Sequence, residues 1–96
     1  MLVSLSTLFA VLGDPGNGVL ADAVAATFPG DYIEIRPGQW FVASTGTAKE
    51  ISDKLGVTPG TAVGSAIVVS ASGYYGRANS QIWEWVAAKI GKPANA

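Results

Sequence analysis

Hydrophobic and polar residues alternate most clearly over residues 31–44, where the sequence reads DYIEIRPGQWFVAS. Residues 32–36 and 39–44 are rich in aromatic and branched side chains with a period of two, which is typical of strands. Pro37 and Gly38 between them supply a fixed φ and a tolerated positive φ, as a tight turn requires. This stretch predicts a β-hairpin.

The length of the hairpin loop sets the register of its two strands. A two-residue loop would place Ile35 opposite Trp40 and Ile33 opposite Val42, both pairs turned toward the helices. The other side of the hairpin would then be lined by Tyr32, Glu34, Phe41 and Ala43. A longer loop would change this register, and it stays an alternative because a type II turn fits the twist of a hairpin badly.

Two short apolar runs predict the other strands. Residues 5–12 and 65–71 are bounded by turn residues and are mostly apolar, with two Ser or Thr residues in each run, which is typical of buried strands. In the second run, Ile67 and Val69 lie on one side and Val68 on the other. We expect both strands to be central in the sheet.

The helices are predicted from apolar spacing and from their caps. Residues 18–28 carry apolar side chains three and four apart, and Asn17 before them is a suitable N-cap.

Two more helices follow the hairpin. Thr47 and Glu50 form a capping box at the start of the next helix, which Gly56 ends. Ser80 is expected to cap a last helix over residues 81–90.

The predicted order is β, α, β, β, α, β and a closing α. Two interleaved split β-α-β units indicate an α+β fold, a ferredoxin-like βαββαβ sandwich with an additional C-terminal helix. Its antiparallel sheet would have the order 4-1-3-2, or a close relative of it, with two helices on one face. We expect residues 1–92 to form one such domain and residues 93–96 a frayed tail.

Composition narrows the chemistry. The chain has 96 residues, 49% of them hydrophobic and 14% charged, which is enough for one core and no second domain. It contains neither Cys nor His, so thiol catalysis, disulfides and the usual zinc ligands are excluded, and the commonest general base is missing. We expect no cofactor and no metal site.

Charge argues against a nucleic-acid partner. The net charge is -1, and basic residues are scattered where a nucleic-acid footprint is usually clustered. Arg36 and Arg77 are the candidate phosphate contacts if folding brings them together.

The first residues argue against a membrane. Residues 1–13 are apolar but have no Lys or Arg before them and are too short to span a bilayer. We expect a cytoplasmic protein without a membrane contact.

Four segments together carry a family resemblance: GQWFVAST, TAKEISDKL, GSAIVVSASGYYG and ANSQIWEWVAAKI. They are similar to the small SinR-like proteins, relatives of the CRISPR-associated Cas-two fold, over about residues 37–90. The resemblance implies a ferredoxin-like homodimer and, in nuclease members, a divalent-metal site on an Asp that ends the first strand. That position falls on Leu12 here, and the nearest carboxylate is Asp14 in the following loop. We expect no catalytic residue, with Asp14 as the candidate if metal-dependent cleavage occurs.

Three functions are consistent with these observations. The preferred one is a non-enzymatic protein-interaction module that forms a homodimer, encoded by a phage or mobile element and acting on a host protein. Its candidate interface residues are Tyr32, Glu34, Phe41, Tyr74, Tyr75 and Trp85, whereas Trp40 and Trp83 fall on expected core stripes.

The two alternatives act on nucleic acid. One is a divalent-metal-dependent nuclease or toxin of the Cas-two type. The other is a non-catalytic RNA- or DNA-binding module in which sheet-face aromatics stack on bases while Arg36 and Arg77 contact phosphates.

Overall fold

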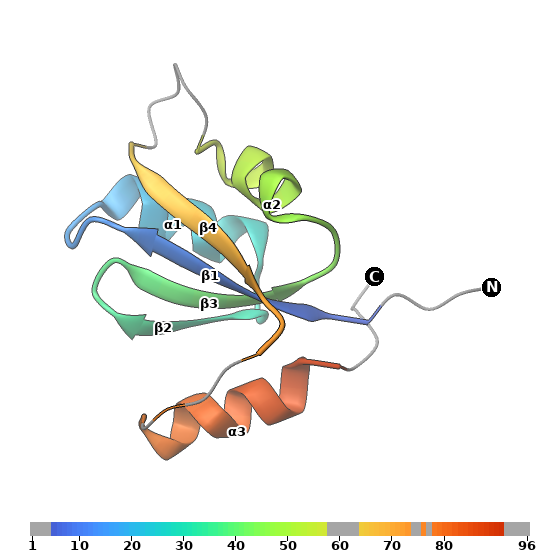
Figure 1. Cartoon of the computed structure of the whole chain (residues 1–96). Helices are drawn as coiled ribbons and strands as arrows, with labels where there is room; N and C mark the ends of the chain where they lie inside the picture. Colours follow the sequence, from blue (N-terminus) through green and yellow to red (C-terminus); the bar gives the residue numbers. More distant parts are fainter. Residues whose placement is uncertain (1–4, 58–63, 74–75, 77, 92–96) are drawn as a thin grey trace.

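The computed structural model describes residues 5–57, 64–73, 76 and 78–91. Within them, a four-stranded sheet and three helices form a small α+β fold (Figure 1). The elements follow the chain as β1 (Thr7–Gly13), α1 (Gly18–Thr27), β2 (Tyr32–Arg36), β3 (Gln39–Ser44), α2 (Ala48–Leu55), β4 (Ala66–Ala71) and α3 (Ser80–Lys89). The predicted tail, residues 93–96, lies outside the described residues.

The strands lie in the order β2-β3-β1-β4, and each neighbouring pair is antiparallel. Counted from β4, this is the order 4-1-3-2, which is compatible with a ferredoxin-like fold. The prediction that the last strand is central is wrong, because β4 is an edge strand. The apolar sequence of β4 suggested a central strand, but Val68 packs against the core while Ile67 and Val69 are exposed on the other side.

Helices α1 and α2 cover one face of the sheet and enclose the main core. β1 and β3 send alternate side chains into this core, because successive residues of a strand point to opposite faces. Its buried members are Phe9, Val11, Leu20, Val24, Phe28, Trp40, Val42, Ile51 and Leu55. Trp40 therefore lies in the core, as the sequence predicts.

Side chains cap all three helices. The Asn17 side-chain oxygen accepts a hydrogen bond from the Leu20 amide at 3.1 Å. The capping box of α2 is present, with the Glu50 amide donating to Thr47 Oγ1 at 3.2 Å and the Thr47 amide donating to Glu50 Oε1 at 3.1 Å. These two predicted helix starts are confirmed.

The N-cap of α3 differs from the prediction. Asn79 Oδ1 accepts from the Gln81 amide at 2.8 Å, so Asn79 is the cap and Ser80 is the first helical residue. Asn and Ser are equally good N-cap residues, and the side chain one position earlier reaches the free amide.

The predicted hairpin register is wrong for β2. Glu34 lies opposite Trp40 and Tyr32 opposite Val42, which puts both on the helix-covered face, while Ile33 pairs with Phe41 on the other. The turn has two residues, but the register shifts between Glu34 and Arg36, where a β-bulge adds one residue. One extra residue moves every side chain beyond it to the opposite face.

Helix α3 lies apart from α1 and α2, next to β2 (Figure 1). Leu8 and Ala43, on the sheet face away from α1 and α2, are buried together with Ile82 and Val86 of α3. These burials place α3 over one end of that face.

Two polar contacts hold α3 in this place. Lys89 Nζ forms an ion pair with Asp31 Oδ1 at 3.2 Å, just before β2. The Gly91 amide donates a hydrogen bond to the Ser6 carbonyl oxygen at 3.0 Å, just before β1. Both contacts lie near the covered end of the sheet.

Candidate functional site

The part of the sheet face that α3 leaves uncovered is apolar. Leu12 pairs with Ile67, and Ala10 pairs with Val69 and with Phe41, so their side chains lie side by side on one surface. We call this surface, Ala10, Leu12, Phe41, Ile67 and Val69, the open face.

Exposure of the open face is high for such large side chains. Ile67 is 65% exposed, Val69 44% and Leu12 40%, while Phe41 and Ala10 are half-buried. Singly scattered apolar residues are normal on a protein surface, but adjacent ones on rigid strands mark contact sites. The open face is therefore the candidate interaction surface.

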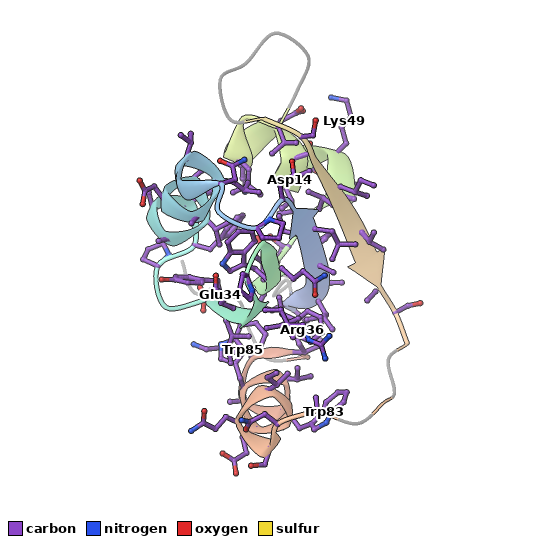
Figure 2. All side chains as sticks on the ribbon, turned by 90° about the vertical axis from the view of Figure 1, so that its left-hand side faces the viewer. Asp14, Glu34, Arg36, Lys49, Trp83 and Trp85 are labelled. Atoms are coloured by element: carbon purple, nitrogen blue, oxygen red, sulfur yellow. The ribbon has the colours of Figure 1, made fainter. Side chains whose placement is uncertain are left out.

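Of the expected interface residues that the structure describes, Phe41 is the one that lies on the open face. Tyr32 is half-buried against the main core, and Glu34 is exposed on the same helix-covered face, so the bulge removes both from the expected surface. Trp85 and Trp83 are half-buried on different sides of α3 (Figure 2). Tyr74 and Tyr75 lie outside the described residues.

Of the two candidate phosphate contacts, one can be placed. Arg36 is exposed and pairs with Gln39, which in turn lies next to Leu12, so Arg36 borders the open face. Glu34, two residues before it, lies on the other side of the hairpin because of the bulge (Figure 2). Arg77 lies outside the described residues.

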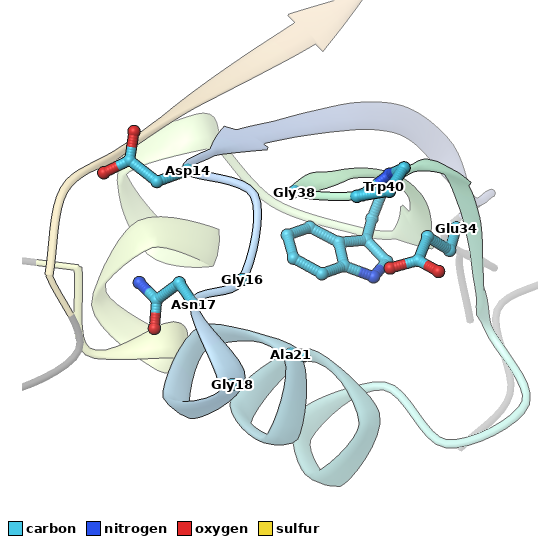
Figure 3. A pocket seen from close by; sticks show the side chains of 9 residues that line it. Asp14, Gly16, Asn17, Gly18, Ala21, Glu34, Gly38 and Trp40 are labelled. Atoms are coloured by element: carbon cyan, nitrogen blue, oxygen red, sulfur yellow. The ribbon is translucent and has the colours of Figure 1, made fainter.

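Asp14 is exposed and lines a pocket of about 180 Å³ at the start of α1. Glu34 and the indole of Trp40 form the opposite side of this pocket, and the Asp14 carboxylate is directed away from the indole (Figure 3). Across the described residues, no group of three or more His, Cys, Asp or Glu side chains is placed to hold a metal ion.

Charged pairs lie away from the open face. Lys49 Nζ donates to Asp53 Oδ2 at 2.9 Å across one turn of α2, and this hydrogen bond and the Asp53 charge raise the pKa of Lys49. Lys49 and Asp53 are both exposed on the helix that covers the other face. The open face itself is uncharged.

Sequence reasoning missed Leu12, Ile67 and Val69 as surface residues. The available signal was the alternation within the last strand, where Ile67 and Val69 share a side opposite Val68. A strand covered on one face and a strand covered on both faces read alike when all their residues are apolar.

None of the helices in the described part of the chain is long and apolar enough to cross a membrane. No protein-family model, no curated protein and no solved structure matches the chain.

Proposed function

We propose that the chain is a non-enzymatic protein-interaction module that forms a homodimer through the β1 and β4 side of the open face. The observation that supports this most is the row formed by Leu12, Ile67 and Val69, three large apolar side chains exposed together on two paired strands. Burying apolar surface contributes about 25 cal/mol per Å². Association therefore gains most from covering this part of the sheet.

A second copy suits this surface because the surface is uncharged. In a two-fold dimer the same patch meets itself, so a charge close to the axis would face a like charge of the second copy. Leu12, Ile67 and Val69 avoid that repulsion, and two copies offer each other matching apolar side chains.

Nucleic-acid functions have less support from the described residues. Arg36 borders the open face, but Lys49 and Lys54 are on α2 at the other face, and Lys89 is engaged with Asp31. A phosphate-binding surface needs several cations on one side of the molecule.

The dimer is tested by placing a charge on the surface. Ile67→Asp puts a carboxylate into the proposed contact, and we expect sedimentation velocity to show a dimer for the parent protein and a monomer for this variant. Val19→Asp is the matched control, because Val19 is also exposed, at 54%, but lies on α1. Circular dichroism checks that both variants stay folded. A parent protein that is monomeric at high micromolar concentration overturns the proposal.

A further inference from the structure

The two edges of the sheet, β2 and β4, are protected to different degrees. Unpaired edge strands attract other strands, and proteins block them with charges, prolines, bulges or covering elements. β2 has these devices: Glu34 and Arg36 are charged, a bulge lies between them, Pro37 follows, and α3 lies beside the strand. The β2 edge is therefore closed to pairing.

β4 has no charge, proline or bulge along its described length, and α2, which contacts it, packs on its helix-covered face. Its sequence, AIVVSA, contains no charged residue and no proline. Its register with β1 runs without a shift from Gly13 opposite Ala66 to Leu12 opposite Ile67 and on to Leu8 opposite Ala71. β4 is thus a straight, apolar edge strand with high strand propensity.

β4 is also held in place from the helix side. Val68 and Ala66 pack against the main core, and α2 contacts the strand. A strand that is already ordered loses little conformational entropy when a second strand pairs with it. The free edge is therefore preorganised for pairing.

We infer that β4 pairs antiparallel with β4 of a second copy, which joins the two sheets into one across a two-fold axis. This inference rests on the proposed homodimer and narrows its contact to β4, so that Ile67 and Val69 lie in the contact and Leu12, one strand away on β1, lies outside it. In an antiparallel pair, directly opposite residues share a face, so the axis passes beside one residue of the strand, Val68 or Val69. In either case Ile67 and Val69 of one copy lie beside those of the other and cover each other.

A second copy of the chain suits the free edge of β4 as a partner for two reasons. The strand is uncharged, so its own symmetry mate meets no like charge. The exposed Ile67 and Val69 lie on the same side of the strand, so the pairing buries apolar surface as well as forming backbone hydrogen bonds. A partner strand without branched apolar residues opposite Ile67 and Val69 would leave these two side chains exposed.

Single-cysteine crosslinking tests the geometry, because the chain has no cysteine of its own. In paired β4 strands the two copies of Val69 lie about 5–8 Å apart, whereas the two copies of Leu12 are at least three strand spacings, about 14 Å, apart. The variants Val69→Cys, Leu12→Cys and Val19→Cys are treated with a thiol crosslinker that spans about 8 Å. This length bridges the two copies of Val69 but is too short to bridge the two copies of Leu12. All three parent side chains are exposed, so the substitutions leave the core intact.

We expect most of the Val69→Cys protein to be crosslinked as a dimer, and Leu12→Cys and Val19→Cys to remain uncrosslinked. Crosslinking at Leu12 but not at Val69 would show that the sheets pack face to face, which overturns the strand pairing and leaves the homodimer standing. No crosslinking at Val69 in a protein that sediments as a monomer overturns both. Amide hydrogen exchange gives an independent reading, since the outward-facing amides of β4 should exchange more slowly as the protein is concentrated.

Discussion

Gly38 shows at the scale of one residue how the hairpin is joined to the rest of the fold. Its φ is +83°, its carbonyl oxygen accepts a hydrogen bond from the Gly13 amide at 2.7 Å, and the residue is buried. A Cβ at this position would lie 2.8 Å from the Asp14 carbonyl carbon and from the Gly13 carbonyl oxygen. Both neighbours are backbone atoms, so the contact cannot be relieved by a side-chain rotation.

We predict that Gly38→Ala lowers the free energy of unfolding by about 2–4 kcal/mol, as the sum of an unfavourable positive φ and a backbone clash. Gly16→Ala is the matched control, since Gly16 has a φ of +84° but no atom within 4 Å of its Cβ position. It should cost only the conformational part, about 1 kcal/mol. Urea unfolding of both variants gives the comparison, and equal losses would show that the close approach at Gly38 is unimportant.

At the scale of elements, α3 decides how much of the sheet remains exposed. Leu8 and Ala43 are buried on the sheet face away from α1 and α2, as are Ile82 and Val86 of α3, and the open face lies beyond Leu8 and Ala43. The helix is tied to the strands by the contacts of Lys89 and Gly91 near its C-terminal end. Its contribution to stability depends on whether it unfolds together with the sheet.

We predict that α3 unfolds with the sheet, so that Ile82→Ala lowers the free energy of unfolding by about 2–4 kcal/mol through the cavity that it leaves. Gln81→Ala, at the exposed neighbouring position, should change it by less than about 0.5 kcal/mol. Denaturant unfolding followed by far-ultraviolet circular dichroism measures both. If Ile82→Ala leaves the main transition where it is, α3 is a separate unit that detaches first.

Across the molecule, the charges of α2 and the apolar open face lie on opposite sides of the sheet, and Arg36 lies at the border of that face. Lys49, Asp53 and Lys54 lie on α2, whereas Leu12, Ile67 and Val69 lie on the opposite side of the sheet. An association that buries an uncharged surface responds to salt differently from one that neutralises phosphates.

We predict that the dissociation constant of the homodimer stays the same or falls as sodium chloride is raised, because screening removes no attraction from an uncharged contact. Equilibrium sedimentation across a salt series measures it. The same series with a labelled oligonucleotide serves as the comparison. A dimer that dissociates at high salt, or an oligonucleotide affinity that falls steeply with salt, would favour a charged contact surface.

Local signals in the sequence were sufficient for the order of the elements and for the N-caps of α1 and α2. The period of two in residues 32–36 and 39–44 predicts both hairpin strands at their observed limits, and the capping box at Thr47 and Glu50 predicts the start of α2. These features depend on neighbouring residues alone, so no knowledge of the fold is needed to find them.

The orientation of β2 and the position of β4 depended on tertiary structure. The bulge before Arg36 turns Tyr32 and Glu34 toward the helices, and a single inserted residue leaves no mark in the alternating pattern. The apolar sequence of β4 shows that its side chains are hydrophobic, but it does not show how many neighbouring residues cover them. Hydrophobic pattern is a local property of the chain, whereas the exposure of Ile67 and Val69 depends on which element packs where, and α3 stops short of them.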